Sequence, residues 1–406
     1  SEILLIVYMV QTGFYNLSKF RTLGDVEQQK VWNEAKSLYE YVDGDRSLII
    51  LLYGIVTLSL ILVFFLIAKS SLKQAYRLEC QSKKGEQILT LKQELKELLN
   101  GNLHITLLTF PVLGILMFTI LPLVFMISMA FTNYSVEGNK LVLFDWVGLE
   151  NFRKIFDFGD SLGQTFWSVF GWTMVWAVVA TFSNYILGML LALFINWKEI
   201  RAKKMWRFCF ALTVAIPHFV TLLIIKSMLQ PEGAVNILLR NLGLIGATQS
   251  LPFFTDATWA RVVVILINIW VGVPYTLLQV TGILQNIPTE LYEAARVDGA
   301  GPIVTFMKIT LPYMLFVTTP YLITTFTGNV NNFNVIFLTT EGLPRSVGST
   351  AGKTDLLITW LYKLTIENQY FDVGAVVGIM TFVTLTIVSL VTFTFSGSNR
   401  NEEAFR

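Results

Sequence analysis

Long apolar runs are the feature that most constrains how this 406-residue chain can fold. A bilayer core about 30 Å thick is crossed by about 20 mostly apolar helical residues, so each run of that length predicts a membrane-spanning helix. Seven runs qualify: 48–68, 105–131, 170–195, 208–229, 262–284, 312–334 and 373–395. A weaker run at 3–20 is interrupted by Gln11, Asn16 and Ser18. We expect an all-α, polytopic transmembrane bundle with seven spans and a truncated eighth at the N-terminus.

Composition agrees with a lipid environment and excludes one large class of function. Apolar residues make up 54% of the chain, charged residues 14%, and the mean hydropathy is +0.59, which is unusual for a water-soluble domain. The net charge is only +2 and the basic residues form no single dense patch, so we expect membrane lipid and no nucleic acid as a partner. Cys80 and Cys209 lie far apart without metal-ligand spacing, and no disulfide is expected.

Lysine and arginine near the span ends set the expected orientation, because such residues are retained on the cytoplasmic side. Two connections, 69–104 and 196–207, are rich in them. Alternation of the spans then places 285–311 and the tail after residue 396 inside as well, and the loops around Val147, Gly233 and Gly342 outside. We divide the chain into 1–100, N-terminal helices with a cytoplasmic linker, and 101–406, a core of six spans. Apolar residues of the linker follow a helical spacing that favours a surface helix over a specific partner site: Ile88, Leu91, Leu95, Leu98 and Leu99.

The cytoplasmic segment 285–311 contains a regular pattern. It reads Ile287-Pro-Thr-Glu-Leu-Tyr-Glu-Ala-Ala-Arg-Val-Asp-Gly-Ala-Gly-Pro302 and continues through Lys308-Ile-Thr-Leu-Pro312. We expect two short helices joined by a sharp turn, in which Thr289 caps the first helix, Glu290 complements its positive end and Gly299 supplies the left-handed residue that ends it. The face expected to fit a groove in a soluble partner consists of Leu291, Ala294 and Ala295.

This pattern resembles the EAA loop of ABC importer permeases. The matching residues are Glu293-Ala294-Ala295, then Gly299 after three residues, then Ile309-x-Leu311-Pro312 after nine more. In that family the loop is the coupling helix that docks on the ATPase, whereas an ordinary pair of interfacial helices is the alternative. The resemblance implies ATPase-coupling roles for Glu293, Ala294, Ala295, Arg296, Asp298 and Gly299.

The chain lacks the phosphate-binding loop G-x-x-x-x-G-K-[ST] that an ATPase needs. The nearest string, at 348–354, is one residue short and falls in a predicted outer loop. We therefore expect a transport subunit rather than an enzyme. It should bind no cofactor itself, and ATP and Mg²⁺ should be used by partner subunits.

Nearly the whole chain after residue 100 resembles the larger permease subunit of maltose and maltodextrin importers. The matching stretches are Val147-Gly-Leu-Glu-Asn-Phe152, Asn268-Ile-Trp-Val-Gly-Val-Pro-Tyr275, Asp298-Gly-Ala-Gly-Pro302, Lys308-Ile-Thr-Leu-Pro312, Asn329-Val-Asn-Asn-Phe333 and Thr354-Asp-Leu-Leu357. The resemblance implies a type I ABC importer permease fold and alternating access in a bacterial cell membrane. It also implies a heterodimer with a second permease, two ATPase subunits and an extracytoplasmic sugar-binding protein.

Two departures from the maltose permease bear on its substrate and its docking. A large extracellular domain of the enterobacterial protein is replaced here by the segment 132–169, so the binding protein has less surface to dock on. Val214 and His218 stand where that permease has a tyrosine and a serine that touch sugar, which argues against strict maltose specificity.

Polar side chains inside the spans suggest the substrate, because such residues are costly in lipid and usually line cavities or helix contacts. Amides can donate to and accept from sugar hydroxyls, and aromatic rings can cover a pyranose face. The predicted substrate-binding residues, most of them matching sugar contacts of the maltose permease, are Asn268, Trp270, Gly272, Tyr275, Thr325, Asn329, Asn332 and His218. Helix packing by hydrogen bonds is the alternative for each.

Two other classes fit less well. A secondary transporter would need acidic groups or broken helices in the membrane, and none of the seven predicted spans contains Asp or Glu. A membrane enzyme is disfavoured because no predicted span contains a metal-ligand cluster, and the two histidines, His104 and His218, fall in different spans or at their edges; no metal site is expected. Permeases for other oligosaccharides, such as raffinose, galactan fragments or cyclodextrin, remain open.

Overall fold

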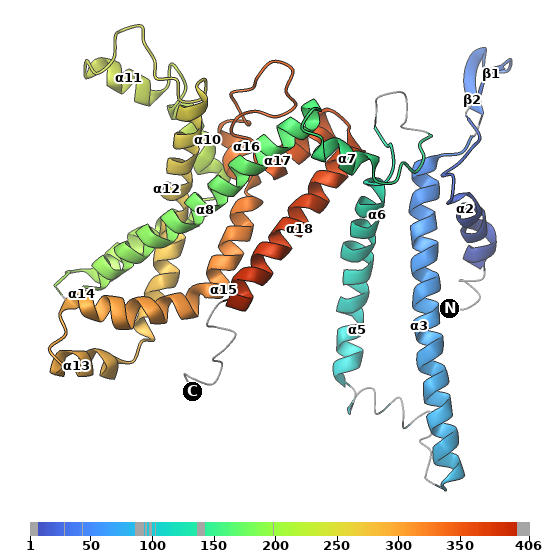
Figure 1. Ribbon diagram of the computed structural model, residues 1–406, viewed down its shortest axis with the longest axis horizontal. Helices are drawn as coiled ribbons and strands as arrows, with labels where there is room; N and C mark the ends of the chain where they lie inside the picture. The colour runs from blue at the N-terminus through green and yellow to red at the C-terminus, as the bar shows by residue number, and fades with distance from the viewer. Residues whose placement is uncertain are drawn as a thin grey trace. The chain divides into compact units, whose positions relative to one another are not determined.

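The computed structural model describes residues 7–27, 29–42, 44–85, 93, 96, 100–101, 103–135, 143–197 and 199–395. The described chain is mostly helical (Figure 1) and divides into two compact units, Ser1–Arg153 with Asn368–Val376 and Lys154–Glu367 with Val377–Arg406. Six described helices are long and apolar enough to cross a membrane, or seven if one bent pair counts as a span. The all-α, polytopic transmembrane fold is thereby confirmed, with a number of spans close to the predicted seven, whereas the domain boundary after residue 100 stays a prediction.

The first unit begins with short elements before its first long helix. The π-helix η1 (Met9–Gly13) and α2 (Phe14–Lys19) fall within the weak run 3–20 and are helical, but they are too short to count as a span. A β-hairpin that the sequence did not suggest follows, with β1 (Gln29–Asn33) paired antiparallel to β2 (Leu38–Val42). The paired rings of Trp32 and Tyr39 lie 5.0 Å apart, a cross-strand aromatic contact of the kind that stabilises two-stranded sheets.

The helix α3 (Ser47–Lys83) contains 37 residues. At 1.5 Å per residue it is about 55 Å long, well beyond the bilayer core, so its last turns extend past the lipid. Lys69, Lys73 and Arg77 lie on this extension. The amphipathic residues predicted for the linker, Ile88, Leu91, Leu95, Leu98 and Leu99, all lie outside the described residues.

The second span of the first unit is continuous but changes its winding. It runs through α5 (Leu103–Ile115), the π-helix η2 (Leu116–Ile120) and α6 (Leu121–Met129). Pro122 has no backbone N–H and therefore cannot form the regular i to i−4 hydrogen bond of an α-helix. The π-helix, which has a wider turn, ends two residues before this proline and accommodates the missing bond. The same arrangement recurs before Pro312, where the π-helix η3 (Phe306–Thr310) leads into α15 (Leu311–Val330).

The second unit is built around two long helices, α8 (Ser161–Asn196) and α12 (Ala257–Gln285). Asp160 and Asp256 cap them, since their carboxylates accept backbone N–H groups of the first turn at 2.9 Å. The helices pack closely because Gly188 of α8 has no side chain, and a Cβ there would lie 2.6 Å from Cβ of Thr276 in α12. Small residues of this kind let helices associate in lipid.

The predicted span 208–229 is broken rather than continuous. It consists of α9 (Lys203–Ala215) and α10 (His218–Met228), which meet at an angle of 86°. Pro217 causes the break, because it lacks an N–H and restricts the preceding Ile216 to an extended conformation, observed at φ −77° and ψ 127°. His218 is consequently the first residue of a new helix.

The remaining elements of the second unit are short helices and two further spans. They are α11 (Ala234–Asn241), α13 (Thr289–Val297), α14 (Pro302–Thr305), α16 (Phe333–Thr339), α17 (Leu357–Tyr362), the π-helix η4 (Lys363–Glu367) and α18 (Phe371–Phe395), whose first six residues belong to the first unit. Within this unit, α13 and α14 lie at the opposite end of α12 and α15 from α11 and α16 (Figure 1).

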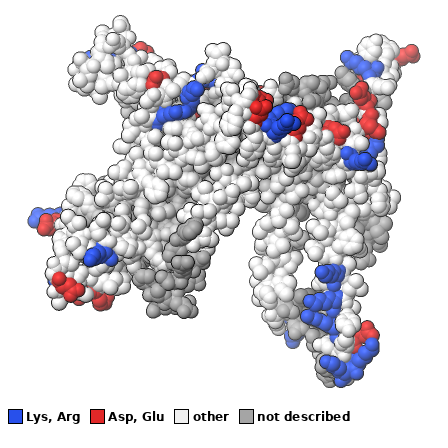
Figure 2. All heavy atoms as spheres, viewed as in Figure 1, with Lys and Arg blue, Asp and Glu red and all other residues white. Residues whose placement is uncertain are grey.

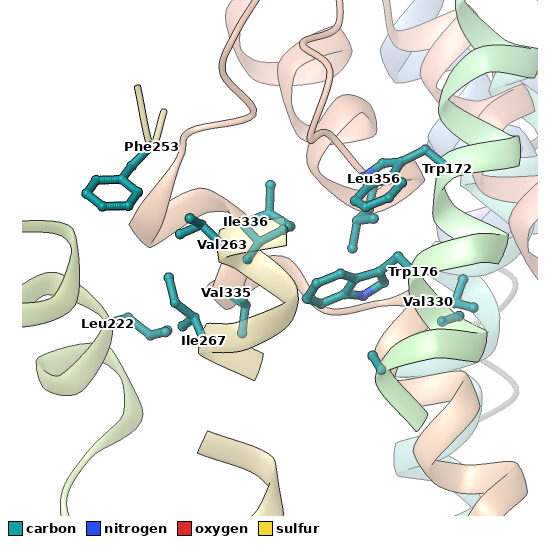
Figure 3. Close-up of a cluster of buried hydrophobic side chains, with 13 residues drawn as sticks. Trp172, Trp176, Leu222, Phe253, Val263, Ile267, Val330, Val335, Ile336 and Leu356 are labelled. Carbon is teal, nitrogen blue, oxygen red and sulfur yellow. The ribbon is translucent and has the colours of Figure 1, made fainter. Parts of the chain in front are cut away.

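A buried cluster joins α8, α10, α12, α15 and α16 near the end of the unit opposite α13. Trp176 of α8 lies near Val330 and Trp172 beside Leu356, while Val335 and Ile336 of α16 lie beside α12 (Figure 3). Charged side chains of this unit on the face shown in Figure 2 gather at the two ends of its helices and leave the middle uncharged. This distribution is that of a helical bundle solvated by lipid along its middle.

Candidate functional site

Three asparagines from different elements meet inside the second unit, and we call them the amide cluster: Asn268 of α12, Asn329 near the end of α15, and Asn332 before α16. Asn332 Nδ2 donates to Asn268 Oδ1 at 3.3 Å. Asn268 and Asn329 are buried and Asn332 is half-buried. The structure therefore brings together three of the residues predicted to bind substrate.

The amide cluster is held by α8. Asn329 Nδ2 donates to Thr181 Oγ1 at 3.0 Å, and the carbonyl oxygen of Asn329 accepts from Trp176 Nε1 at the same distance. The Asn332 side chain also caps α16 by accepting from the N–H of Val335 at 3.2 Å. These bonds fix the orientation of the amides by contacts made across three helices.

Two polar atoms beside the amide cluster are buried but unpaired within the part of the chain that the structure describes. They are Asn268 Nδ2, a donor, and Asn184 Oδ1, an acceptor on α8. Leaving such a group unpaired costs about 1–3 kcal/mol, so natural proteins keep few of them. Gly272, one turn from Asn268, allows the close approach, because a Cβ there would lie 2.2 Å from Asn184 Nδ2.

One more predicted residue, Tyr275, extends the same face of α12, and two others lie on the neighbouring helices α10 and α15. Tyr275 lies seven residues, or two turns, after Asn268, and its ring meets that of His218 edge to face with centroids 5.3 Å apart. Both side chains are exposed, Tyr275 by 39%. Thr325 is half-buried on α15, one turn before Asn329. The polar face thus continues from buried amides to accessible rings.

Trp270 lies elsewhere. It is two residues from Asn268 and therefore about 200° round α12 from it. Its side chain is 71% exposed and lines an apolar groove with Phe194 of α8 and Phe210 of α9. The structure does not bring Trp270 to the amide cluster. A sugar bound at the cluster would therefore not lie against the Trp270 ring, contrary to the prediction from the sequence.

The contribution of α8 to the site was not predicted from the sequence. Thr181 and Asn184 contact the predicted site, and Tyr185 OH lies 2.7 Å from Thr318 Oγ1 one turn further along. A second link joins Thr276 Oγ1 and Tyr321 OH at 3.0 Å. The available signal was the spacing of Thr181, Asn184 and Tyr185, three polar-bearing residues on one face of an otherwise apolar span.

The predicted coupling loop forms a short helix, α13, followed by a turn and α14. Gly299 has φ +74°, as expected for the left-handed residue that ends the helix, and the N–H of Ala300 donates to the carbonyl of Ala295 at 2.8 Å. Glu290 lies in the first turn. The predicted cap is wrong: Thr289 is already the first helical residue, Pro288 occupies the capping position, and no side chain caps the helix.

The surface of α13 divides into an inner and an outer side. Ala295 is buried, and Tyr292 OH anchors the helix to Thr310 Oγ1 at 3.1 Å. Ala294 is exposed and Val297 is 88% exposed. The predicted face of Leu291, Ala294 and Ala295 is thus divided, because Ala295 packs inward while the other two face outward; Glu293, Arg296, Asp298 and Gly299 are also exposed.

The ends of α8, α9 and α12 converge beside this loop. Lys203 Nζ donates to the carbonyl of Asn196 at 3.0 Å, and Arg207 binds the Asn196 side chain. Arg207 also lies 3.0 Å from the Gln285 side-chain oxygen when that amide is oriented to accept. The basic link 196–207 and the segment after Gln285 therefore lie at one end of the unit, in agreement with their predicted location on one side of the membrane.

The comparisons with known proteins establish the family. Residues 184–400 match the model of the binding-protein-dependent transport system inner membrane component. The chain is 34% identical over 392 residues to the galactooligosaccharides transport system permease protein GanP of Bacillus subtilis, covering 96% of this chain and 92% of that protein. This chain belongs to the family of inner membrane components of binding-protein-dependent transport systems, and it is a multi-pass protein of a bacterial cell membrane.

Other relatives are named for maltodextrin. The maltodextrin transport system permease protein MdxF of Bacillus subtilis is 36% identical over 374 residues, covering 88% of this chain and 84% of that protein. The fold also matches a bacterial ABC transporter involved in the import of the acidic polysaccharide alginate, with a TM-score of 0.61, 22% identity and coverage of 76% of this chain and 99% of that one. The chain is therefore a permease of the ABC sugar-importer type.

Proposed function

We propose that this chain passes an uncharged oligosaccharide of the maltodextrin type across the membrane. The observation that carries the proposal is the amide cluster with its two unpaired polar atoms, Asn268 Nδ2 and Asn184 Oδ1. A donor and an acceptor in a buried site suit vicinal hydroxyl groups, each of which both donates and accepts. Tyr275, exposed at the end of the same face, can cover an apolar sugar ring.

The absence of charge in the proposed site supports a neutral ligand. Within the described residues, Asn268, Asn329 and Asn332 bond to amide, hydroxyl and backbone groups and to no Lys, Arg, Asp or Glu. An acidic sugar would need a cationic partner, because an uncompensated charge in a low-dielectric site is costly. The relatives named for maltodextrin and galactooligosaccharides fit this chemistry.

We further propose the assembly that the family implies: a second permease, two ATPase subunits and an extracytoplasmic sugar-binding protein. In this proposal α13 couples the chain to an ATPase. The support is its exposed apolar surface, Val297 and Leu291, on a short helix whose inner side is anchored through Tyr292. Short amphipathic helices commonly dock by such a face in a partner's groove.

Reconstitution tests the substrate. The purified complex is placed in proteoliposomes, and ATP hydrolysis is measured with the binding protein loaded with maltotriose or with a β-1,4-galactotriose. We expect severalfold stimulation by maltotriose. Stimulation by the galactotriose alone would favour a second candidate substrate, a galactooligosaccharide. That candidate is considered because the relative named for galactooligosaccharides matches this chain over nearly its whole length. Stimulation by neither sugar would refute both.

A pair of neighbouring substitutions tests the coupling role. Ala294 is exposed and Ala295 is buried, so Ala294→Trp should leave the complex intact but abolish sugar-stimulated ATP hydrolysis. Ala295→Trp should instead disturb α13 itself and reduce assembly, because an overpacked core shifts the backbone. Normal stimulation in Ala294→Trp, with the subunits assembled, would show that α13 does not dock on the ATPase.

A further inference from the structure

An apolar groove of about 630 Å³ runs along α8, α9 and α12. Leu190 and Phe194 of α8, Phe210 of α9, and Trp270 and Val273 of α12 line it. The Thr213 hydroxyl, also in the lining, donates to the carbonyl of Phe210 at 2.7 Å and is therefore satisfied within its own helix. The groove is lined almost entirely by apolar side chains of membrane-spanning helices and offers few polar groups to a ligand.

One end of the groove reaches the basic link. Lys203, Arg207, Phe210 and Thr213 recur every three or four residues and so share one face of α9. Lys203 Nζ donates to the carbonyl of Asn196, two residues after Phe194 in α8. The face that enters the groove through Phe210 thus becomes cationic within one turn.

The described part of the basic link carries a strong excess of positive charge. It holds one acidic residue, Glu199, against Arg201, Lys203, Lys204 and Arg207. Arg201 and Lys204 are exposed, and α9 begins at Lys203 without a side-chain cap, so its first N–H groups add positive potential. Trp197 and Trp206 flank the charges and are 55% and 46% exposed, as is typical of residues at the lipid headgroup level.

We propose that the groove and the basic link together bind one anionic phospholipid of the adjacent leaflet. An acyl chain lies along Phe194, Phe210 and Trp270, and the phosphate group lies against Arg201, Lys204 and the first turn of α9. Each part fits a different portion of the ligand: the apolar groove requires a hydrocarbon chain, and the cationic end requires an anion. A free phosphate would satisfy only the second part, and a zwitterionic lipid only the first.

Photo-crosslinking on the assembled complex tests the site. The complex is placed in phosphatidylcholine nanodiscs that contain a trace of phosphatidylglycerol with a diazirine on its acyl chain, and labelled residues are mapped by mass spectrometry. An identical phosphatidylcholine probe is run in parallel. We expect the anionic probe to label the groove residues Leu190, Phe194 and Trp270 more strongly than the zwitterionic probe does.

Matched variants separate the two halves of the site. Arg201→Gln with Lys204→Gln should lower groove labelling by the anionic probe on the order of fivefold per charge removed. Leu190→Trp should remove groove labelling by filling the space. The controls, Lys69→Gln with Lys73→Gln and Leu390→Trp on α18, alter equally exposed basic and apolar positions and should change nothing.

Three results would overturn the proposal: equal labelling by the two probes, unchanged labelling in the Arg201→Gln and Lys204→Gln variant, or crosslinking of Leu190→Cys to the second permease instead of lipid. The last would show that a protein helix fills the groove. If Leu190→Trp does not assemble, the double Gln variant still decides the question, because both of its positions are exposed.

Discussion

Two buried polar clusters of the second unit differ in how completely they are paired. The amide cluster contains neutral groups and leaves Asn268 Nδ2 unpaired within the described residues. The other cluster is an ion pair: Lys363 Nζ lies 2.7 Å from Asp355 Oδ2, and the two side chains are 7% and 0% exposed.

The other hydrogen-bonding atoms of the ion pair are bonded to nearby residues in and beside the loop between α16 and α17. Asp355 also accepts from the Thr359 hydroxyl at 2.9 Å and from the N–H of Gly352 at 2.6 Å, while Lys363 donates to the carbonyl of Glu341 at 2.8 Å. Charges buried in this way are tolerated only when paired and hydrogen-bonded. The satisfied cluster is thus suited to hold the loop between α16 and α17, and the partly satisfied one to hold a ligand.

The largest expected effect comes from breaking the ion pair. Lys363→Met leaves the Asp355 carboxylate buried without its counter-charge, which typically costs about 3–5 kcal/mol. We expect a large loss of assembled complex and a lower Tm of what remains, measured by fluorescence-detected size-exclusion and thermal unfolding. The same substitution at the exposed Lys353 is the control. An unchanged Tm in Lys363→Met would mean that the pair does not hold the loop.

A smaller effect is expected where the amide cluster meets α8. Gly272→Ala places a Cβ 2.2 Å from Asn184 Nδ2, and overpacking of this kind costs about 1–3 kcal/mol. Uptake should fall more than assembly, since the amides would be displaced. Gly282→Ala on the same helix has no atom within 4 Å of its new Cβ and should behave as the parent. Equal sugar uptake by the two variants would show that transport does not require the close packing of Gly272 against Asn184.

Removing the unpaired donor should affect binding rather than folding. Asn268→Ala deletes Nδ2, which has no partner within the described chain, together with the 3.3 Å bond from Asn332. A neutral hydrogen bond to the sugar contributes about 0.5–1.5 kcal/mol, so the KM for uptake should rise up to about tenfold with kcat little changed. If instead the Tm falls and the KM stays constant, the cluster serves helix packing and not the ligand.

The smallest effect is expected for an exposed pair. Arg240 lies 2.8 Å from Glu232 and holds the pKa of that carboxyl below its usual range. A lowered pKa contributes stability above the ordinary Glu pKa and loses it as pH falls, but solvent screens a pair this exposed. Glu232→Gln should therefore leave the Tm unchanged within error at pH 7 and pH 5. If Glu232→Gln lowered the Tm as much as Lys363→Met does, solvent exposure would not explain why the two ion pairs differ in their contribution to stability.

Much of the site was predictable, and the failures have physical reasons. Asn268 and Asn329 were predicted because polar side chains inside spans usually line cavities or helix contacts, and Asn332 was predicted from the resemblance to the maltose permease. Gly299 was predicted because a helix end often needs a left-handed residue. Thr181 and Asn184 were missed, since their role depends on which helix packs against α8. The break at Pro217 inside the predicted span 208–229 was not foreseen, because the size of a bend depends on how neighbouring helices restore the lost hydrogen bonds.

The sequence by itself determined where the apolar spans fall, the left-handed residue Gly299 that follows α13, and the family, because hydropathy, backbone conformation and motif spacing are local properties. Only the tertiary structure decided that Trp270 lines a groove away from the amide cluster, that Ala295 faces inward, and that Asp355 and Lys363 pair. The physical reason is that a side chain's partners are set by packing between distant segments. Contacts across helices are not encoded in any one helix.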